Sequence, residues 1–405
     1  MVYTENEIKD YVKQEDVKFI RLAFCDPFGC QKNISILPEK LDCAFKYGIP
    51  FDISALRSFG SSEEYTSLRL CPDASTLALL PWRPTHGKVI RMYCDIKHSD
   101  GTPFSIDSRQ ILKNAIKAAQ LESVSCDIGA EIKFYLFKTD EAGNRTNIPY
   151  DNGSYMDVAP LDCGENIRRE ICLIADEMGI KPLTSHHEEG PGQNEIDFCY
   201  SDPLSAADNA VTMKNIITTT AARNGLYASF SPKPIENKPG NDMHLTIIPK
   251  SNEHPDYFDS FTAGIMKHIK EITIFLNPTH ESYTRLSSNR SPKYIARSEK
   301  YRSQLIRIAK TESDSKFIKL RSPDAHTNPY LAYALILYAG LDGIKNSLTP
   351  PELIKENLFF ADKKLLDTIE TLPDNRKAAA NIMKNSSFVK SILPEDIINL
   401  YDSMI

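Results

Sequence analysis

The chain has no long hydrophobic run. No stretch approaches the roughly 18 consecutive apolar residues that a membrane-spanning helix requires, although 41% of its 405 residues are hydrophobic. The N-terminal segment, MVYTENEIKDYVKQEDVKF, is charged and amphipathic, and it has neither the apolar core of a secretory signal nor the acid-poor composition of a transit peptide. These absences predict a cytoplasmic protein with no membrane partner.

Paired cysteine motifs are also missing. The nine cysteines are scattered singly and their number is odd, which argues against the disulfide framework of a secreted protein. Cys25 and Cys30 flank a turn, but no CxxC motif or Cys/His pair elsewhere completes a zinc site. Small buried side chains in a reducing compartment are the simpler interpretation.

The chain lacks an excess of positive charge. Lysine and arginine number 48 against 54 aspartates and glutamates, which gives a formal net charge of -6. General binding to nucleic acid needs a basic surface, so we expect no nucleic-acid partner. Any site for an anion must therefore be local.

The length and the order of the predicted elements indicate two domains. Residues 17–36 predict two strands joined by the turn DPFG, a β-hairpin. Further strand-like runs, STLALLPW and KVIRMYCDI, precede the turn-rich DGTPFSIDSR, so we expect a β-rich domain at 1–102 and a second domain at 103–405. In the second domain, strand-like segments alternate with long helical patterns, which predicts an α+β or α/β fold. The segments PELIKENL, RKAAANIMKN and PEDIINLYDSM predict short helices near its end.

Three groups of residues could carry chemistry. The segment 185–195, SHHEEGPGQNE, gathers carboxylates and imidazoles and is either a metal site or a solvated loop. Glu131 and Lys133 alternate in AEIKFYLF, so they share one face of a strand, as a pair in a cleft or as a surface ion pair. A run of arginines either grips phosphate or carboxylate or forms ordinary salt bridges: Arg285, Arg290, Arg297, Arg302, Arg307 and Arg321.

Motifs along nearly the whole chain resemble those of the glutamine synthetase family, most closely its bacterial type I branch. The matching segments are FIRLAFCDPFG, PFDIS, PDASTLALLPW, DGTPF, IGAEIKFYLF, SHHEEGPGQNEIDF, SPKP, DMH, ESYTRL and RSPDAHTNPYLAYALILYAGLDGIKN. The resemblance implies an N-terminal β-grasp-like domain at 1–102. It also implies, at 103–405, a catalytic domain of the glutamine synthetase/guanido kinase type, a curved antiparallel sheet with helices.

The resemblance further implies assembly of the chain with itself. Family members form a homo-oligomeric ring, a hexamer or a dodecamer of two stacked rings, with active sites between subunits. Asp52, in PFDIS, matches a catalytic residue that reaches into the neighbouring site to help bind ammonium. The terminal strap of type I enzymes has no counterpart in this sequence, which leaves open whether two rings stack.

Family chemistry uses ATP and two divalent ions, Mg²⁺ or Mn²⁺. Glutamate attacks ATP to form a γ-glutamyl phosphate, ammonia then displaces phosphate, and the ions neutralise the developing charge. The resemblance implies four retained metal ligands: Glu131, Glu188, Glu195 and His244. In the family, one further glutamate binds each ion. In this chain those two positions hold Lys133 and Lys319.

The two lysines change the charge of the implied site. Three glutamates and two lysines leave about one negative charge without any metal, so the ammonium groups could replace one or both ions and act as catalytic cations. The nucleotide side also departs from the family, because the family follows the metal-binding histidine with a second histidine and a serine, where this chain has Leu245, Thr246, Ile247 and Ile248. The loop SSNRSP places Arg290 or a neighbour where the family has a glutamate.

The residues that recognise anions are retained. By resemblance, Arg285 holds the substrate carboxylate, and Gly240 and Arg321 also belong to the substrate site. Arg302 and Arg307 match arginines at the nucleotide phosphates, and Arg302 also has a catalytic role. The small-molecule partner is therefore expected to be an amino acid or a similar anion.

Three functions are compatible with this pattern. The first is a ligase that joins an amino-acid carboxylate, such as that of glutamate, to ammonia or another amine with ATP. The second is a catalytically silent homologue that binds an amino acid or an anion as a sensor or partner. The third is an enzyme that does not use ATP and in which Lys133, Lys319 or Glu131 performs acid–base chemistry; a lysine base would need a lowered pKa.

Overall fold

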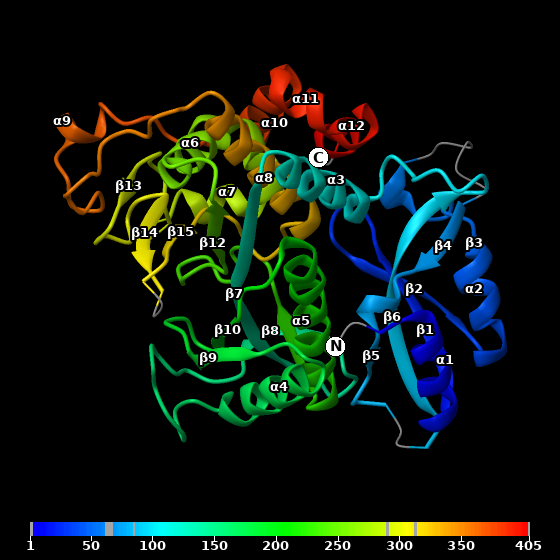
Figure 1. Cartoon of the computed structure of the whole chain (residues 1–405). Helices are drawn as coiled ribbons and strands as arrows, with labels where there is room; N and C mark the ends of the chain where they lie inside the picture. The colour runs from blue at the N-terminus through cyan, green and yellow to red at the C-terminus, as the bar shows by residue number, and fades with distance from the viewer. Residues whose placement is uncertain (1–2, 61–67, 84–85, 289–290, 312–313, 404–405) are drawn as a thin grey trace.

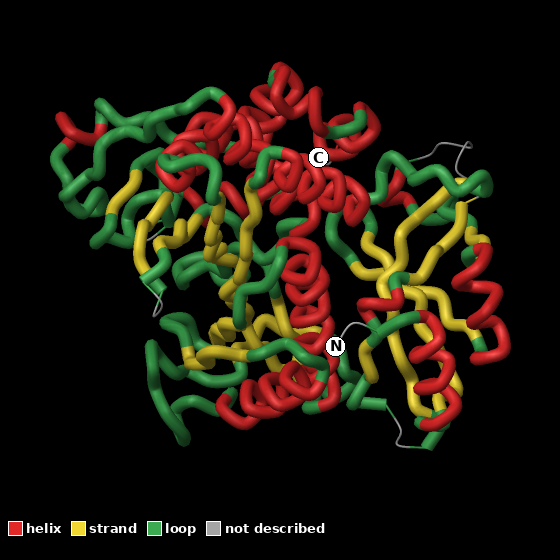
Figure 2. The backbone as a smooth tube through the Cα atoms, viewed as in Figure 1, coloured by secondary structure: helices red, strands yellow, loops and turns green. Residues whose placement is uncertain are grey.

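Two β-sheets, each with its own helices, organise the chain. The computed structural model describes residues 3–60, 68–83, 86–288, 291–311 and 314–403. Figure 1 shows a smaller lobe built from the first hundred residues, in blue and cyan, beside a larger lobe that contains the rest. Helices flank the strands in both lobes (Figure 2), which confirms the predicted α+β class. None of the helices described is both long and apolar enough to cross a membrane.

The smaller sheet has six strands in the order β2-β1-β6-β4-β3, with β5 paired to β6. The predicted hairpin is confirmed, because β1 and β2 pair antiparallel across the DPFG turn. In that turn one Asp26 oxygen accepts hydrogen bonds from the backbone N–H groups of Phe28 and Cys30, at 3.1 and 2.9 Å. The strands are β1 (Val17–Cys25), β2 (Gln31–Ile36), β3 (Ile49–Phe51), β4 (Leu68–Pro72), β5 (Ala78–Leu79) and β6 (Lys88–His98), and the helices are α1 (Glu5–Gln14) and α2 (Leu41–Tyr47).

The larger sheet has nine strands in the order β13-β14-β15-β12-β7-β10-β9, and β8 and β11 also pair with β7. Except for the parallel pair β13 and β14, its strands pair antiparallel. The strands are β7 (Val124–Thr139), β8 (Arg145–Pro149), β9 (Pro182–His187), β10 (Gln193–Phe198), β11 (Leu226–Ser229), β12 (Met243–Ser251), β13 (Arg297–Ser298), β14 (Ile306–Lys310) and β15 (Lys316–Leu320). The 16-residue strand β7 thus connects the two halves of the sheet.

Helices of the larger lobe begin at side chains suited to capping. Asp202 and Asn328 accept hydrogen bonds from the first turns of α5 and α8, and each is followed by a proline at the first helical position. The helices are α3 (Ser108–Leu121), α4 (Glu165–Glu177), α5 (Pro203–Arg223), α6 (Tyr257–Leu276), α7 (His280–Leu286), α8 (Pro329–Lys345), α9 (Lys363–Leu366), α10 (Arg376–Asn385), α11 (Ser387–Ile392) and α12 (Glu395–Ser403).

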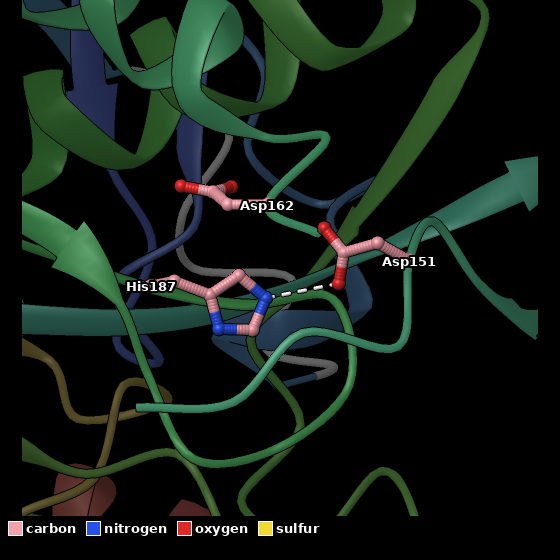
Figure 3. Close-up of side chains that lie close together, drawn as sticks. All are labelled: Asp151, Asp162 and His187. Carbon is pink, nitrogen blue, oxygen red and sulfur yellow. Dashed lines mark hydrogen bonds and ion pairs between the residues drawn. The ribbon is translucent and has the colours of Figure 1, made fainter. Parts of the chain in front are cut away.

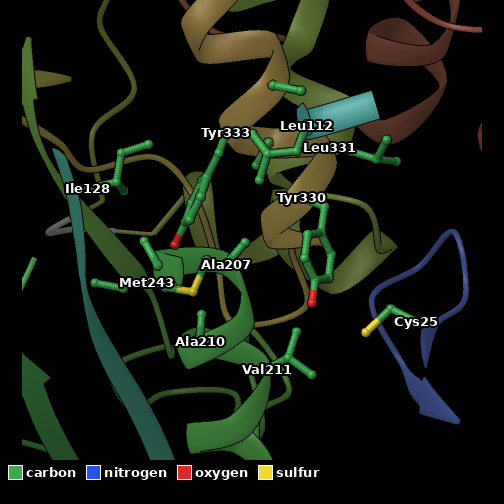
Figure 4. Close-up of a cluster of buried hydrophobic side chains, with 14 of the residues drawn as sticks. Cys25, Leu112, Ile128, Ala207, Ala210, Val211, Met243, Tyr330, Leu331 and Tyr333 are labelled. Carbon is green, nitrogen blue, oxygen red and sulfur yellow. The ribbon is translucent and has the colours of Figure 1, made fainter. Parts of the chain in front are cut away.

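The core of the larger lobe is centred on α8. Figure 4 shows Tyr330 and Tyr333 of this helix among apolar side chains of α5, β7 and β12. Helix α8 also packs against α6 at backbone distance, because a Cβ atom built on Gly343 would lie 2.0 Å from the carbonyl oxygen of Ser260. Reciprocally, a Cβ atom on Gly264 would lie 2.0 Å from the carbonyl oxygen of Ala339. These two glycines therefore permit the close approach of α6 and α8.

The turn between β1 and β2 joins the two lobes. The backbone oxygen of Pro27 accepts hydrogen bonds from the Asn328 side chain, at 2.9 Å, and from the Tyr401 hydroxyl, at 3.0 Å. The ring of Tyr401 also lies 5.2 Å from that of Phe28, centroid to centroid. The first hairpin is thus held by the start of α8 and by α12, the last helix described.

One predicted helix is wrong. The segment PELIKENL (351–358) has no helical turn, because its backbone pairs with other parts of the chain instead. Ile354 donates its N–H to the carbonyl oxygen of Arg297, and Gln304 donates to the carbonyl oxygen of Glu356. These tertiary hydrogen bonds outweigh the helical propensity of the segment, whereas RKAAANIMKN and PEDIINLYDSM form α10 and α12 as predicted.

Asp107 lies where the predicted domains meet, and we propose the boundary at residue 103, between β6 and α3. Its two carboxylate oxygens accept the N–H groups of Ile96 in β6, at 2.9 Å, and Arg109 in α3, at 3.0 Å. The side chain is buried, and burial raises the pKa of its carboxyl group from 3.8 to about 6.

This raised pKa predicts a specific dependence of stability on pH. Between about pH 4 and pH 6 the folded chain binds more protons at Asp107 than the unfolded chain, so this group lowers stability progressively as pH rises through that window. We expect Asp107→Asn to remove this component, which amounts to a few kcal/mol at most. Urea midpoints of both proteins at pH 4 and pH 6.5 measure it. Asp100→Asn, in an exposed turn, is the control, and an unchanged pH dependence in Asp107→Asn would contradict the prediction.

Candidate active site

Charged residues of four strands meet on one face of the larger sheet. In β7, Glu131 and Lys133 share a face, as the alternation in the sequence predicts. Strand β10 places Glu195 directly opposite Lys133, and β12 places His244 directly opposite Glu131. Strand β15 adds Lys319, which pairs with Thr246 of β12. The register of the antiparallel strands therefore gathers residues that are up to 188 positions apart.

Lys133 is surrounded by carboxylates. Its Nζ atom lies 3.2 Å from Glu188 Oε1, 3.2 Å from Glu195 Oε2 and 3.4 Å from Asp242 Oδ1. Its side chain is only 14% exposed. Of the two interpretations of Glu131 and Lys133, the surface ion pair is therefore wrong, because Lys133 is an enclosed cation.

Lys319 and His244 divide the two oxygens of Glu131 between them. Lys319 Nζ forms a hydrogen-bonded ion pair with Glu131 Oε1, and His244 Nδ1 lies 3.2 Å from Oε2. The other ring nitrogen of His244 lies 3.3 Å from Asp242 Oδ2, at ion-pair distance but without hydrogen-bond geometry. Asp242 thus links the surroundings of Lys133 to those of Lys319.

The pKa values of these groups follow from burial and mutual charge. Burial opposes the charge of Lys133, but Asp242, Glu195 and Glu188 outweigh it and raise the pKa of its ammonium group above the usual value. Burial likewise opposes the charge of Glu131, but His244 and Lys319 lower the pKa of its carboxyl group to about 2. At neutral pH Lys133 is thus firmly protonated, which argues against its proposed role as a general base.

Arg285 is a buried guanidinium without a carboxylate partner at ion-pair distance among the described residues. It is 1% exposed and extends from α7, and its Nη2 donates to Asn277 Oδ1, at 2.9 Å, and to the carbonyl oxygen of Ser322. Its Nε and Nη1 atoms have no hydrogen-bond partner in the chain. Burial lowers the pKa of this guanidinium, which Asp324 and Asp242 partly offset. A guanidinium with two free donors is suited to bind an anion.

Gly240 lies against the stem of Arg285. A Cβ atom at this position would lie 2.4 Å from the carbonyl oxygen of Pro232 and 2.6 Å from Cγ of Arg285. The carbonyl oxygen of Gly240 accepts a hydrogen bond from Gln193 in β10, at 3.0 Å. Only glycine leaves room here, so two residues predicted to contact substrate do lie together.

Three further arginines lie close enough to repel one another. Arg321 is buried, and burial, aided by the charges of Arg302 and Arg307 and partly offset by Asp242 and Glu131, lowers the pKa of its guanidinium. The Nε atoms of Arg307 and Arg321 are buried and have no partner within the described chain. A cluster of like charges with unpaired donors is what a phosphate-binding site requires.

Not every predicted residue reaches this region. Asp52 is exposed on the smaller lobe, where its carboxylate accepts a hydrogen bond from the N–H of Ser54 at 2.8 Å. No hydrogen bond or ion pair of the described residues joins it to the cluster. Arg297 pairs with Asp259 instead of facing the site. Arg290 lies outside the residues that the structure describes.

Sequence reasoning missed two aspartates of the cluster, Asp242 and Asp197. Asp242 precedes His244 by two positions, and this alternation is a signal that could have revealed it. Asp197 of β10 lies opposite Glu131, and its carboxylate is within 4.8 Å of those of Glu131 and Glu195. These two aspartates make the cluster more acidic than the sequence count of three glutamates indicated.

His187 holds the strand end that carries Glu188. Figure 3 shows its ring close to Asp151 and Asp162, with an interaction marked to Asp151. Its Nδ1 donates to the carbonyl oxygen of Glu188, at 2.6 Å, and its Nε2 lies 2.9 Å from Asp151 Oδ1. Although the three side chains are close enough to hold a metal ion, Asp162 is paired with Arg168, and Asp151 accepts three backbone N–H groups. We therefore interpret this group as structural.

We expect His187→Ala to destabilise the fold by about 3 kcal/mol. The substitution leaves a cavity, takes a hydrogen bond from the Glu188 carbonyl and deprives the buried Asp151 of a partner. Urea unfolding measures the change. His280→Ala, on an exposed site at the start of α7, is the control, and equal stabilities of the two variants would contradict the structural role of His187.

The donor set can be compared with what divalent ions require. Two of the acidic groups that could hold a metal ion lie in the charged cluster: His186, Glu188 and Glu195, and Glu131, Glu195 and Asp197. Oxygen and imidazole donors suit Mg²⁺ or Mn²⁺. However, a lysine ammonium group lies at ion-pair distance from Glu188 and Glu195, and another contacts Glu131. These residues do not fit a pair of protein-bound divalent ions.

The fold and the site together define a structural class. It comprises two-domain α+β proteins in which a curved antiparallel sheet carries a charged cluster of carboxylates beside arginines for anions. Comparison with protein-family models gives two matches, "Glutamine synthetase, beta-Grasp domain" at residues 16–99 and "Glutamine synthetase, catalytic domain" at residues 105–404. The chain belongs to the glutamine synthetase family, and the β-grasp and catalytic folds expected from the motifs are confirmed.

Relatives match along almost the full chain. A glutamine synthetase of Methanosarcina mazei is 41% identical over 98% of this chain and 92% of its own length, and one of Clostridium saccharobutylicum is 39% identical over 98% and 93%. Among solved structures, GmaS in complex with ADP has a TM-score of 0.86 at 26% identity and covers 97% of this chain and 93% of GmaS. The Plasmodium falciparum glutamine synthetase, at 23% identity over 99% and 94% of the two chains, shares the fold with a TM-score of 0.85.

Proposed function

We propose that this chain is a carbon–nitrogen ligase that joins the side-chain carboxylate of glutamate, or of a similar amino acid, to ammonia or another amine with ATP. The observation that carries the proposal is the set of buried, unpaired guanidinium donors on Arg285, Arg307 and Arg321. Buried donors without a partner destabilise the ligand-free protein, and a bound anion would supply the missing partners. Relatives named glutamine synthetase at 39–41% identity support the reaction class.

In this proposal each group of charges has its own task. Arg285 binds the α-carboxylate of the amino acid, with Gly240 leaving room beside it. Arg302, Arg307 and Arg321 bind the phosphates, and Lys133 and Lys319 add positive charge to the cluster. The substrate carboxylate attacks the γ-phosphorus, so the bond to the ADP oxygen breaks. The amine nitrogen then attacks the acyl carbon, loses a proton, and releases inorganic phosphate.

A second function is favoured by the lysines themselves. Lys133 and Lys319 contact the carboxylates on which the family's metal-dependent phosphoryl transfer relies. A catalytically silent homologue that binds an amino acid or another anion as a sensor or partner would keep the arginines and lose the ions. This alternative shares the ligand site with the ligase and differs from it only in turnover.

Phosphate release from ATP distinguishes the two functions. The purified chain is incubated with ATP, Mg²⁺ or Mn²⁺ and glutamate, across ammonia, hydroxylamine and a panel of amines. Release that depends on the amine establishes the ligase, and the best amine names the substrate class. No release together with no ATP binding would exclude the ligase and leave the silent homologue, for which glutamate binding is then measured directly.

We further propose that the chain assembles into a ring with itself, as its family resemblance implies, and that Asp52 contributes to the site of a neighbour. Exposed apolar side chains on the segment between β8 and α4 support a subunit contact: Tyr155, Met156, Val158 and Leu161. For a subunit of 45.6 kDa, light scattering after gel filtration should give six or twelve times this mass. A monomer at micromolar concentration would contradict the proposal.

A further inference from the structure

The surroundings of Lys133 compensate the charge of an ammonium group. Three carboxylates, of Glu188, Glu195 and Asp242, lie at ion-pair distance, within 3.4 Å of its nitrogen, although Asp242 Oδ1 makes no hydrogen bond. The three carboxylates come from different parts of the fold. Glu188 follows β9, Glu195 lies in β10, and Asp242 precedes β12. They therefore surround a single cation that is already part of the chain.

The second half of the cluster is equally occupied. Both oxygens of Glu131 are engaged, one by Lys319 and one by His244, and the second nitrogen of His244 faces Asp242. A divalent ion at this position would need Glu131 or His244 as a ligand. It would have to displace the Lys319 ammonium group, which is 17% exposed, and would then be repelled by it at short range.

Asp242 joins these two halves. Its Oδ1 faces Lys133 and its Oδ2 faces His244, so one carboxylate contacts both. The cost of burying a carboxylate is offset only by cations close to it, and Lys133 is the nearest lysine. Asp242 is thus the counterion that a fixed ammonium group requires.

We infer that Lys133 and Lys319 are built-in cations that take the place of two divalent ions, so that the site binds its anionic ligand without any metal ion held by the protein. This inference rests on the proposed function, since it assumes that the cluster is the ligand site of the ligase. Its test, however, does not depend on turnover.

Binding of Mn²⁺ alone, followed by the electron paramagnetic resonance of the free ion, is the first measurement. We expect the unmodified chain to show no stoichiometric Mn²⁺ binding at micromolar concentration. Lys133→Glu and Lys319→Glu should each tighten Mn²⁺ binding by about tenfold or more, and the double variant by about a hundredfold, because each change removes a repelling charge and adds an oxygen ligand. Lys310→Glu, which changes charge equally on an exposed strand end, is the matched control.

Two outcomes would overturn the inference. One is stoichiometric Mn²⁺ binding by the unmodified chain, which would mean that the lysines tolerate the ion. The other is the absence of any gain in folded Lys133→Glu, Lys319→Glu or double variants, which would mean that the lysines are not what excludes it. Activity is measured separately, so a silent protein with the expected Mn²⁺ profile would contradict the ligase and leave the inference intact.

A second measurement on the unmodified chain covers the case in which the variants do not fold. A ligand that binds only the native state raises the thermal midpoint. We expect neither EDTA nor added Mn²⁺ to change that midpoint, and we expect glutamate to raise it equally in EDTA and in Mn²⁺. The inference would be overturned if EDTA lowered the thermal midpoint, or if glutamate raised the midpoint only when Mn²⁺ is present.

Discussion

Replacing Arg285 by methionine should lower the affinity for glutamate at least a hundredfold, about 3 kcal/mol. The guanidinium is buried and has two unpaired donor atoms, and no carboxylate in the described part of the chain is in ion-pair contact with it. A ligand carboxylate can therefore pair with it without breaking an internal ion pair. Methionine fills a similar volume without the charge. Isothermal titration with L-glutamate measures the affinity directly and requires no turnover.

The stability of the same variant gives a second expected result. Because an uncompensated buried charge disappears, we expect Arg285→Met to be as stable as the unmodified chain or more stable. Arg285→Lys keeps the charge but not the planar fork, and its affinity should fall between the other two. Arg223→Met, at an exposed position on α5, is the control. Glutamate binding by Arg285→Met at full affinity would show that another group holds the carboxylate.

Gly343→Ala should destabilise the chain by at least about 3 kcal/mol. The added Cβ atom would lie 2.0 Å from the Ser260 carbonyl oxygen and 2.8 Å from the Gly264 nitrogen, both of them backbone atoms that cannot rotate away. Helices α6 and α8 would have to separate, and their contact is central to the larger lobe. This destabilisation exceeds the stabilisation, roughly 1 kcal/mol, that alanine normally gives a helix relative to glycine.

A matched substitution isolates the cause. Asn381→Ala introduces alanine on the exposed face of α10 and should change stability by less than about 1 kcal/mol. Urea midpoints of the two variants, together with their yields of soluble protein, are the measurements. If Gly343→Ala were as stable as Asn381→Ala, the two helices would not approach each other as closely as described here.

Local chemistry explains which parts of the fold could be predicted. Asp26 and the glycine of the DPFG turn specify a hairpin within a few residues, and the capping residues Asp202 and Asn328 mark the starts of α5 and α8. The helix predicted for PELIKENL does not form, because the conformation of this segment depends on tertiary hydrogen bonds to Arg297 and Gln304. No local pattern records such partners.

The candidate site was predictable in composition but not in arrangement. Family motifs supplied Glu131, Lys133 and the arginines, and alternation placed the first two on one face. The position of Lys133 between Glu195 and Asp242 depends on the register of β7 with β10 and on the segment before β12. That register is set by a sheet whose strands are far apart in sequence, so the enclosure of the ammonium group emerges only from the folded structure.

The contact between Pro27 and Tyr401 has a consequence for how the chain folds. The two residues are separated by 374 positions, so the hydrogen bond that helps to attach the first hairpin cannot form until residue 401 has left the ribosome. A loop of that size closes slowly, because its ends must find each other at a large cost in chain entropy. The two lobes therefore acquire this attachment only after residue 401 has been synthesised.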